Sequence, residues 1–190
     1  MSVPSVDDDS AAVVWHRRGL RVADNPAVVA AAREAETVCP LFVVDPRFYG
    51  ADGIACDARL RFLGECLTDL ADQYDERGTA LVLAHGDPLD VLSTFADAGW
   101  ALYATADPVA RYGAARDDRA AELGVEFVAE DGLTRGPDSR EGWSDRAEAY
   151  LTAEPRSPGD LGAHAVDSTT TVAAVEDRYD VSPDKTRVPT

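Results

Sequence analysis

A cluster of cationic side chains follows the first apolar run of the sequence. Residues 11–15 read AAVVW, and His16 and Arg17 then open the stretch HRRGLR, which holds three arginines within five residues. Such guanidinium groups could clamp an anionic ligand, because each presents a planar fork of N–H donors. In a chain with 35 Asp and Glu residues, they could equally form ion pairs with nearby carboxylates. The pattern leaves both interpretations open.

Carboxylates follow two of the later apolar runs. Asp45 comes directly after residues 37–44 (TVCPLFVV), and Asp107 lies shortly after residues 101–105 (ALYAT). A carboxylate at a strand end can hydrogen-bond a hydroxyl or ring nitrogen of a ligand, or it can begin a turn. A third carboxylate, Asp87, stands in a Gly-Asp-Pro turn, where we expect it to cap a helix.

The sequence predicts neither a metal site nor a catalytic constellation. It contains no G-x-G-x-x-G and no G-x-x-x-x-G-K-[ST] motif, so neither a standard dinucleotide fold nor a P-loop is supported. We expect Arg116 and Asp117 to form weak surface ion pairs. The histidines and cysteines lie too far apart for metal-ligand or C-x-x-C spacing: His16, His85, His164, Cys39, Cys56 and Cys66.

The hydrophobic pattern predicts the scaffold that positions these residues. Five short apolar runs alternate with helical patterns, which is typical of β-α-β units. We predict an α/β fold that is Rossmann-like, with three α/β/α layers and a five-stranded parallel sheet. The predicted strands are residues 11–15, 37–44, 80–84, 101–105 and 125–129, and the predicted helices are residues 26–34, 57–76, 88–98, 114–123, 142–151 and 172–179.

The same pattern predicts the domain organisation. We expect a disordered N-terminus at residues 1–10, one α/β domain at residues 11–151, and a linker-like tail at residues 152–190. Trp143 and Tyr150 share one face of a helix and are expected to pack on the domain. In parallel sheets, ligands bind beyond the carboxyl ends of the strands, so a site is expected there.

The charge excludes some partners. The formal net charge is -17, and the 190 residues include 24 Asp but a single Lys. Adaptation to high salt explains this composition, and so does the preference of a GC-rich genome for Arg over Lys. Either way, such a surface repels nucleic-acid phosphates, so no direct contact with nucleic acid is expected. No apolar run approaches a membrane span and no secretory signal begins the chain, which predicts a cytoplasmic protein without membrane contact.

Several motifs resemble one family. VWHRRGLR at residues 14–21, followed by DNPA, is similar to the opening of DNA photolyases and cryptochromes, W-[FH]-R-x-x-L-R-x-x-D-N-x-A. The likeness continues in order through four more motifs and covers residues 11–151, the whole predicted α/β domain. These motifs are LFVVDP at residues 41–46, RLRFL at 59–63, GDP at 86–88 and RD at 116–117.

The resemblance implies a light-harvesting role. In that family this N-terminal domain can hold a second chromophore, which passes excitation energy to a flavin in a separate helical domain. That flavin repairs pyrimidine dimers in DNA or signals. The resemblance therefore implies that this chain binds 8-hydroxy-deazaflavin or methenyltetrahydrofolate. His16, together with residues 42–46, is more similar to the deazaflavin-binding branch.

The resemblance also implies a set of cofactor-binding residues. Phe42, Val44 and Ile54 would supply an apolar wall for a planar chromophore. Arg17 or Arg59 would stabilise a chromophore anion, and Asp45 would orient its ring. The full candidate set is His16, Arg17, Phe42, Val44, Asp45, Ile54, Arg59 and Asp107.

The chain stops at Thr190, where members of that family continue into a flavin-binding domain. We therefore expect no FAD on this chain, no catalysis by this chain alone, and a separate FAD-binding domain or partner chain. Two other classes of function fit the same fold. One is an interaction module without a ligand, and the other is a nucleotide-binding domain of the universal-stress type.

Overall fold

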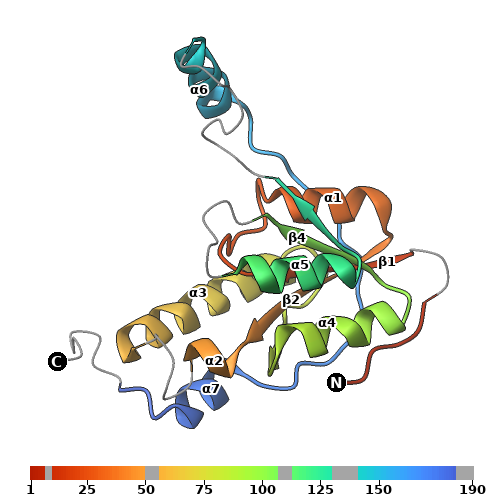
Figure 1. The fold of residues 1–190 in the computed structure, drawn as a ribbon, viewed down its shortest axis with the longest axis vertical. Coiled ribbons are helices and arrows are strands. Elements are labelled where there is room, and N and C mark those ends of the chain that lie inside the picture. Colours follow the sequence, from red (N-terminus) through yellow and green to blue (C-terminus); the bar gives the residue numbers. More distant parts are fainter. Residues whose placement is uncertain (7–9, 50–55, 107–112, 130–140, 183–190) are drawn as a thin grey trace.

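The computed structural model describes residues 1–6, 10–49, 56–106, 113–129 and 141–182. A five-stranded sheet lies at its centre, with strand order β3-β2-β1-β4-β5 and parallel pairing throughout (Figure 1). The strands are β1 (Ala11–His16), β2 (Thr37–Val44), β3 (Val82–His85), β4 (Ala101–Thr105) and β5 (Val125–Val128). The helices are α1 (Pro26–Glu34), α2 (Pro46–Tyr49), α3 (Asp57–Asp75), α4 (Pro88–Asp97), α5 (Ala114–Glu122), α6 (Trp143–Thr152) and α7 (Val172–Arg178).

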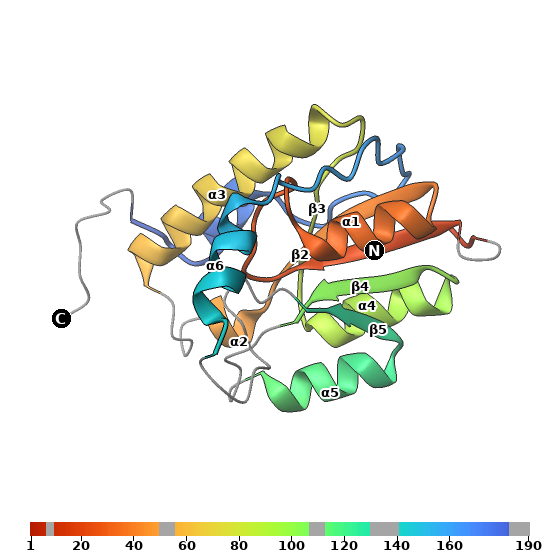
Figure 2. The same cartoon turned by 90° about the horizontal axis from the view of Figure 1, so that it is seen from above.

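The two faces of the sheet bury separate apolar clusters, because successive side chains of a strand point to opposite faces. Val13 and Trp15 of β1 pack in the cluster beneath α4 and α5, whereas Ala12 and Val14 pack beneath α1 and α3. Figure 2 shows α1 and α3 on one side of the strands and α5 on the other. The predicted α/β class, its three layers and its five-stranded parallel sheet are confirmed.

Local signals set most of the element boundaries, which differ from the predicted ones by no more than two residues. Pro26 occupies the first turn of α1, and the side chain of Asn25 accepts hydrogen bonds from two backbone N–H groups of that turn. Asp87 caps α4 in the same way, as predicted. The longest helix, α3, has 19 residues and one apolar stripe. Within the described part of the chain, no helix has the length and apolar character needed to cross a membrane.

The strand order creates a crevice at the carboxyl end of the sheet. β1 lies between β2 and β4, and the chain leaves β1 toward α1 on one face of the sheet. The chain after β4 leads instead to α5 on the opposite face. Ligands of open α/β sheets bind at such a switch point, where the two connections diverge.

We call residues 156–182 the C-terminal strap, of which residues 164–170 lie beside the outer edge of β3. The amide of Leu83 donates to the hydroxyl of Ser168 at 2.9 Å, and the amide of Thr169 donates to the carbonyl of Leu83 at 2.9 Å. α7 then packs against α3 through Val172 and Val175. The strap therefore occupies backbone groups of an edge strand that would otherwise be open to pairing with another chain. The segment predicted to be a linker-like tail thus contacts the domain at several points between residues 156 and 182.

The strap also approaches β2 closely. The carbonyl of Leu161 accepts a 2.8 Å hydrogen bond from the amide of Val38, in the part of β2 that precedes its pairing with β3. Gly162 has φ +67°, and a Cβ there would lie 2.5 Å from the carbonyl oxygen of Glu36. Only glycine fits both the backbone conformation and this approach.

The described part of the N-terminus makes defined contacts, although composition predicted disorder over residues 1–10. The amide of Val6 donates to the carbonyl of Ala98 at 2.9 Å. The indole N–H of Trp100 donates to the carbonyl of Pro4 at 2.8 Å. These bonds attach residues 1–6 to the end of α4.

The expectation that Trp143 and Tyr150 pack on the domain is wrong. Figure 1 shows α6 standing away from the rest of the molecule, and the two side chains are 44% and 40% exposed. Ala147 is the one buried residue of this helix. Since α1, α3, α4 and α5 already cover both faces of the sheet, no sheet surface is left for α6.

Replacing Gly162 by alanine tests whether the strap is docked as described. We expect the free energy of unfolding to fall by at least about 2 kcal/mol, because the new methyl group meets backbone and the φ value disfavours an L residue. Gly159 is the matched control, since it also has positive φ but a Cβ at that position would have no atom within 4 Å. Gly159→Ala should cost about 1 kcal/mol. Urea denaturation measures both values, and equal losses would contradict the docking of the strap.

Candidate functional site

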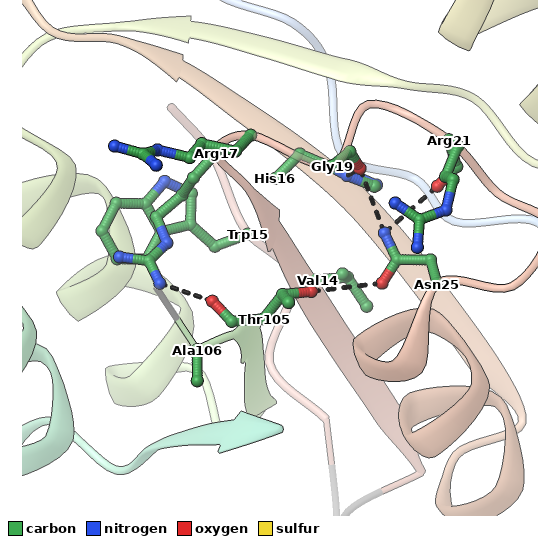
Figure 3. A pocket seen from close by; sticks show the side chains of 10 residues that line it. Val14, Trp15, His16, Arg17, Gly19, Arg21, Asn25, Thr105 and Ala106 are labelled. Atoms are coloured by element: carbon green, nitrogen blue, oxygen red, sulfur yellow. Dashed lines mark hydrogen bonds between the residues drawn. The ribbon is translucent and has the colours of Figure 1, made fainter. Parts of the chain in front are cut away.

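A cavity of about 310 Å³ lies at the switch point, where β1 and β4 end (Figure 3). Its walls come from the end of β1, from the loop that follows as far as Asn25, from Thr105 at the end of β4 and from Ala106 after it. Of the predicted site residues, His16 and Arg17 line this cavity.

Asn25 holds the loop and the strand end together. Its side-chain N–H group donates to the carbonyls of Gly19 at 3.2 Å and Arg21 at 3.1 Å. Its Oδ1 caps α1 and also accepts a 3.3 Å hydrogen bond from the hydroxyl of Thr105. One buried amide therefore connects the loop, α1 and β4, as Figure 3 shows.

His16 is a buried, neutral part of the cavity wall. Its Nε2 lies 2.6 Å from the hydroxyl of Tyr74, and its Nδ1 lies 3.3 Å from the carbonyl of Gly19. A carbonyl can only accept, so Nδ1 carries the hydrogen and Nε2 accepts from the tyrosine. Burial lowers the pKa of His16 from 6.5 to about 4, because the charged ring would lose its hydration. At neutral pH, His16 thus contributes shape and hydrogen bonds but no charge.

Arg17 is held by protein groups. Its Nη1 donates to both carboxylate oxygens of Asp117 at 2.7 Å, and its Nη2 donates to the carbonyl of Thr105 at 2.5 Å. The guanidinium of Arg17 also lies 5.0 Å from the ring centre of Trp15. The guanidinium of Arg116 lies at the same distance from that ring centre. The side chains of Arg17 and Asp117 are 10% and 17% exposed, so this is a partly buried ion pair. The expectation that Asp117 forms only a weak surface pair is wrong.

The charge of the cavity lining is positive. Every charged residue among the described ones that line it is an arginine: Arg17, Arg18 and Arg21. Asp117 neutralises Arg17, and Arg18 and Arg21 are the other two cations of the lining. The charged side chains of the lining are therefore of the sign that suits an anionic ligand.

The other predicted site residues lie elsewhere. Phe42 and Val44 are 2% and 1% exposed and belong to the core beneath α1 and α3. Asp45 accepts a 2.9 Å hydrogen bond from the amide of Arg47 and so begins α2, a single turn that the sequence pattern did not reveal. Arg59 is exposed on the first turn of α3. Two further predicted residues, Ile54 and Asp107, lie outside the described residues.

A second polar cluster lies at the ends of β2 and β3. Arg47 bridges Asp45 at 3.3 Å and Asp87 at 2.8 Å. Beside them, Nε2 of His85 lies 2.7 Å from the hydroxyl of Tyr179 in the strap. Burial lowers the pKa of His85 below its usual value. Arg47 joins the two aspartates at the carboxyl end of the sheet, and the contact between His85 and Tyr179 attaches the strap there.

Sequence reasoning did not assign several cavity residues, namely Arg18, Arg21, Asn25 and Thr105. The three-arginine stretch carried a signal for the first two, although it could not say which arginine an aspartate would neutralise. In the described part of the chain, no group of three or more His, Cys, Asp or Glu side chains is placed to hold a metal ion.

Comparison with known proteins relates the chain to one family. The family model described as DNA photolyase matches residues 12–134. A chloroplastic/mitochondrial cryptochrome DASH from Solanum lycopersicum is 39% identical over 92 residues, which is 46% of this chain and 16% of that relative. A (6-4)DNA photolyase from Arabidopsis thaliana is 36% identical over 98 residues, which is 47% of this chain and 18% of that relative. The matched segment is thus less than one fifth of either relative.

Solved structures share the fold. An archaeal photolyase from Sulfolobus tokodaii superimposes with a TM-score of 0.65 and 21% identity, covering 88% of this chain and 41% of that protein. A bacterial class III photolyase from Agrobacterium tumefaciens gives a TM-score of 0.67 and 21% identity, covering 97% of this chain and 41% of that protein. This chain therefore has the fold of less than half of each of these two proteins.

The buried imidazole of His16 predicts a specific loss of stability in acid. Its pKa is lower in the folded state than in the unfolded state, so the unfolded chain binds more protons between pH 6.5 and pH 4. Stability contributed by the neutral ring is present above pH 6.5 and is lost as the pH falls. Relative to His16→Gln, which does not titrate, the wild type should lose about 2–3 kcal/mol between pH 7 and pH 4.5. Chemical denaturation at several pH values measures this difference, and parallel pH profiles for the two proteins would contradict it.

Removal of the Asp117 charge should leave Arg17 as a partly buried cation without its counter-ion. We expect Asp117→Asn to lower the free energy of unfolding by about 2 kcal/mol. Asp118 is the matched control, because it is the next residue of α5 and does not pair with Arg17 in the bonds described above. Asp118→Asn should change stability by less than about 0.5 kcal/mol. Thermal and urea denaturation of both variants provide the measurement, and a loss of equal size in both would refute the proposed importance of the pair.

Proposed function

This chain belongs to the DNA photolyase family, and from that premise we propose that it is a chromophore-binding α/β domain whose ligand occupies the switch-point cavity. The ligand is a planar aromatic anion that harvests light, with 8-hydroxy-deazaflavin or methenyltetrahydrofolate as the candidates. The observation that carries the proposal is the cavity itself, in which every charged residue among the described lining is an arginine.

The size and lining of the cavity support this ligand class. A volume of about 310 Å³ is at the lower end of the range of about 300–1,000 Å³ seen for small-molecule sites. That space suits a ring system whose side chain extends into solvent. Trp15 and Val14 supply apolar surface, while Arg18 and Arg21 supply cations. A planar anion needs this combination of apolar wall and fixed positive charge.

A structural neighbour supports the proposed role. The Sulfolobus tokodaii photolyase is described as carrying two FAD molecules, with the implication of a novel light-harvesting cofactor. We extend only the principle to this chain, namely that a fold of this kind can serve a second, light-harvesting chromophore. FAD is therefore included among the ligands to be tested.

The proposed domain performs no bond-making step. When bound, the chromophore supplies light absorption. Arg18 and Arg21 bind its anionic groups, Asn25 and Thr105 keep the loop and strand end in place, and neutral His16 avoids placing an additional charge in the wall. Excitation then passes to a flavin in a separate domain or partner chain, which is the part that repairs DNA or signals.

Two other functions make different predictions for the same cavity. A nucleotide-binding domain of the universal-stress type would prefer an adenine nucleotide to a chromophore. An interaction module would bind neither. The proposed chromophore and an adenine nucleotide are both anions, and the composition of the cavity favours either of them. A measurement of ligand binding must therefore decide between these two functions.

Purified protein should bind 8-hydroxy-deazaflavin, methenyltetrahydrofolate or FAD more tightly than ATP, as measured by fluorescence titration and by a shift of the absorbance band. Arg18→Ala and Arg21→Ala should each raise the dissociation constant about tenfold, since a charge-assisted contact is worth about 1.4 kcal/mol. Arg59→Ala is the control, because Arg59 is exposed on α3 and does not line the cavity. Preference for ATP would favour the nucleotide-binding alternative, and binding of none of the four would favour the interaction module.

A further inference from the structure

The loop that lines the cavity contains a residue in an unfavourable backbone conformation. Asp24 has φ +55°, in the left-handed region that side chains other than glycine rarely adopt. Such a conformation costs about 1 kcal/mol and persists only where surrounding contacts hold it in place. The neighbouring residue, Asn25, is the buried amide that joins the loop to β4.

The contacts that hold Asp24 come from the first residue of the C-terminal strap. The amide of Asp24 donates to the carbonyl of Arg156 at 2.8 Å. In return, Nε of Arg156 donates to Oδ1 of Asp24 at 3.0 Å, and the amide of Arg156 donates to the same oxygen at 3.4 Å. Three bonds thus join residues that are 132 positions apart. The hydrogen bond from Arg156 also holds the pKa of the Asp24 carboxyl below its usual value.

The effect of Asp24 extends directly to the cavity. Its carbonyl accepts a 3.1 Å hydrogen bond from Nη2 of Arg21, one of the two cations assigned to the ligand. The side chain of the following residue, Asn25, is also fixed in position, because it donates to the carbonyls of Gly19 and Arg21. A change in the backbone at Asp24 would therefore redirect Arg21 and displace Asn25 together.

The opposite side of the loop is anchored by α3. The amide of Val22 donates to Oε1 of Gln73 at 3.2 Å, and His16 pairs with Tyr74 at 2.6 Å. These bonds fix the beginning and the middle of the loop. They do not involve Asp24, whose own amide and carboxylate are bonded by Arg156 of the strap.

We infer that Arg156 is a positioning residue for the ligand cavity, which sets the direction of Arg21 by clamping Asp24 in its left-handed conformation. Arg156 itself does not line the cavity. It instead lines a separate cleft of about 540 Å³ between the loop and α6, together with Asp24, Tyr150 and Leu151. Any contact that moves this part of the strap thereby changes the affinity of the cavity, and a bound ligand in turn stabilises the clamp.

The test has two arms: the first, amide hydrogen exchange, does not rest on the proposed function, and the second, ligand binding, does. Arg156→Met removes the side-chain bond of the clamp, Arg156→Lys restores a single cationic donor, and Asp24→Gly removes the carboxylate while relieving the backbone strain. Arg61→Met is the matched control. It breaks the ion pair of Arg61 with Glu176, whose side chains are 36% and 21% exposed, against 45% and 33% for Arg156 and Asp24.

The first arm measures amide hydrogen exchange by mass spectrometry in the full chain without ligand. In Arg156→Met and Asp24→Gly, exchange should rise about tenfold in residues 17–25 and stay unchanged in β1 and α3. Arg156→Lys should lie between these variants and the wild type, and Arg61→Met should match the wild type over residues 17–25. Unchanged exchange in the loop would overturn the inference. Faster exchange throughout the domain would overturn it too, because Arg156 would then serve general stability.

The second arm measures the dissociation constant of whichever of 8-hydroxy-deazaflavin, methenyltetrahydrofolate or FAD binds the wild type. Arg156→Met should raise it about tenfold, Arg156→Lys should recover part of the loss, and Arg61→Met should leave it unchanged. Equal affinities in Arg156→Met and the wild type would overturn the inference. If the wild type binds none of the three, the proposed function fails, and the exchange arm alone decides whether Arg156 positions the loop.

Discussion

The order of the strands imposes one constraint on which the rest of the structure depends. β1 and β4 are hydrogen-bonded neighbours, yet the chain leaves them toward helices on opposite faces of the sheet. No single connection can cover the point where the two paths separate. The cavity at that point is a consequence of topology, and its lining comes from the ends of β1 and β4 and from the residues that follow them.

The chain lines this opening with polar groups that already have partners. Asn25 satisfies loop carbonyls and helix amides, His16 is bonded to Tyr74, and Arg17 is paired with Asp117. Among the described residues, no buried side-chain nitrogen or oxygen lacks a hydrogen-bond partner. Such a fully bonded wall keeps its shape without a ligand, which lowers the ordering cost of binding.

The strap performs two tasks with one segment. Along β3 it occupies edge amides and carbonyls, and through α7 it covers apolar side chains of α3. At its beginning, Arg156 holds the loop of the cavity, and near its end Tyr179 bonds His85 at the carboxyl end of the sheet. The same segment of chain therefore covers the edge strand β3 and contacts the loop that lines the candidate site. α6 differs from it, because its Trp143 and Tyr150 stay partly exposed.

The sequence by itself determined the class of fold and nearly all of its elements. Helix caps such as Asn25 and Asp87, and the alternation of apolar runs with helical stripes, are encoded within a few residues of where they act. The residues of the candidate site were harder to predict from the sequence. Residues in a sheet buried on both faces look alike in sequence, so Phe42 and Val44 could not be recognised as core residues without the structure. The partner of Arg17 lies 100 residues farther on and that of His16 lies 58 residues farther on. Only the tertiary structure could decide which arginine pairs with an aspartate and which side chains line the cavity, because Coulomb attraction and hydrogen bonding depend on distance in space and not on distance along the chain.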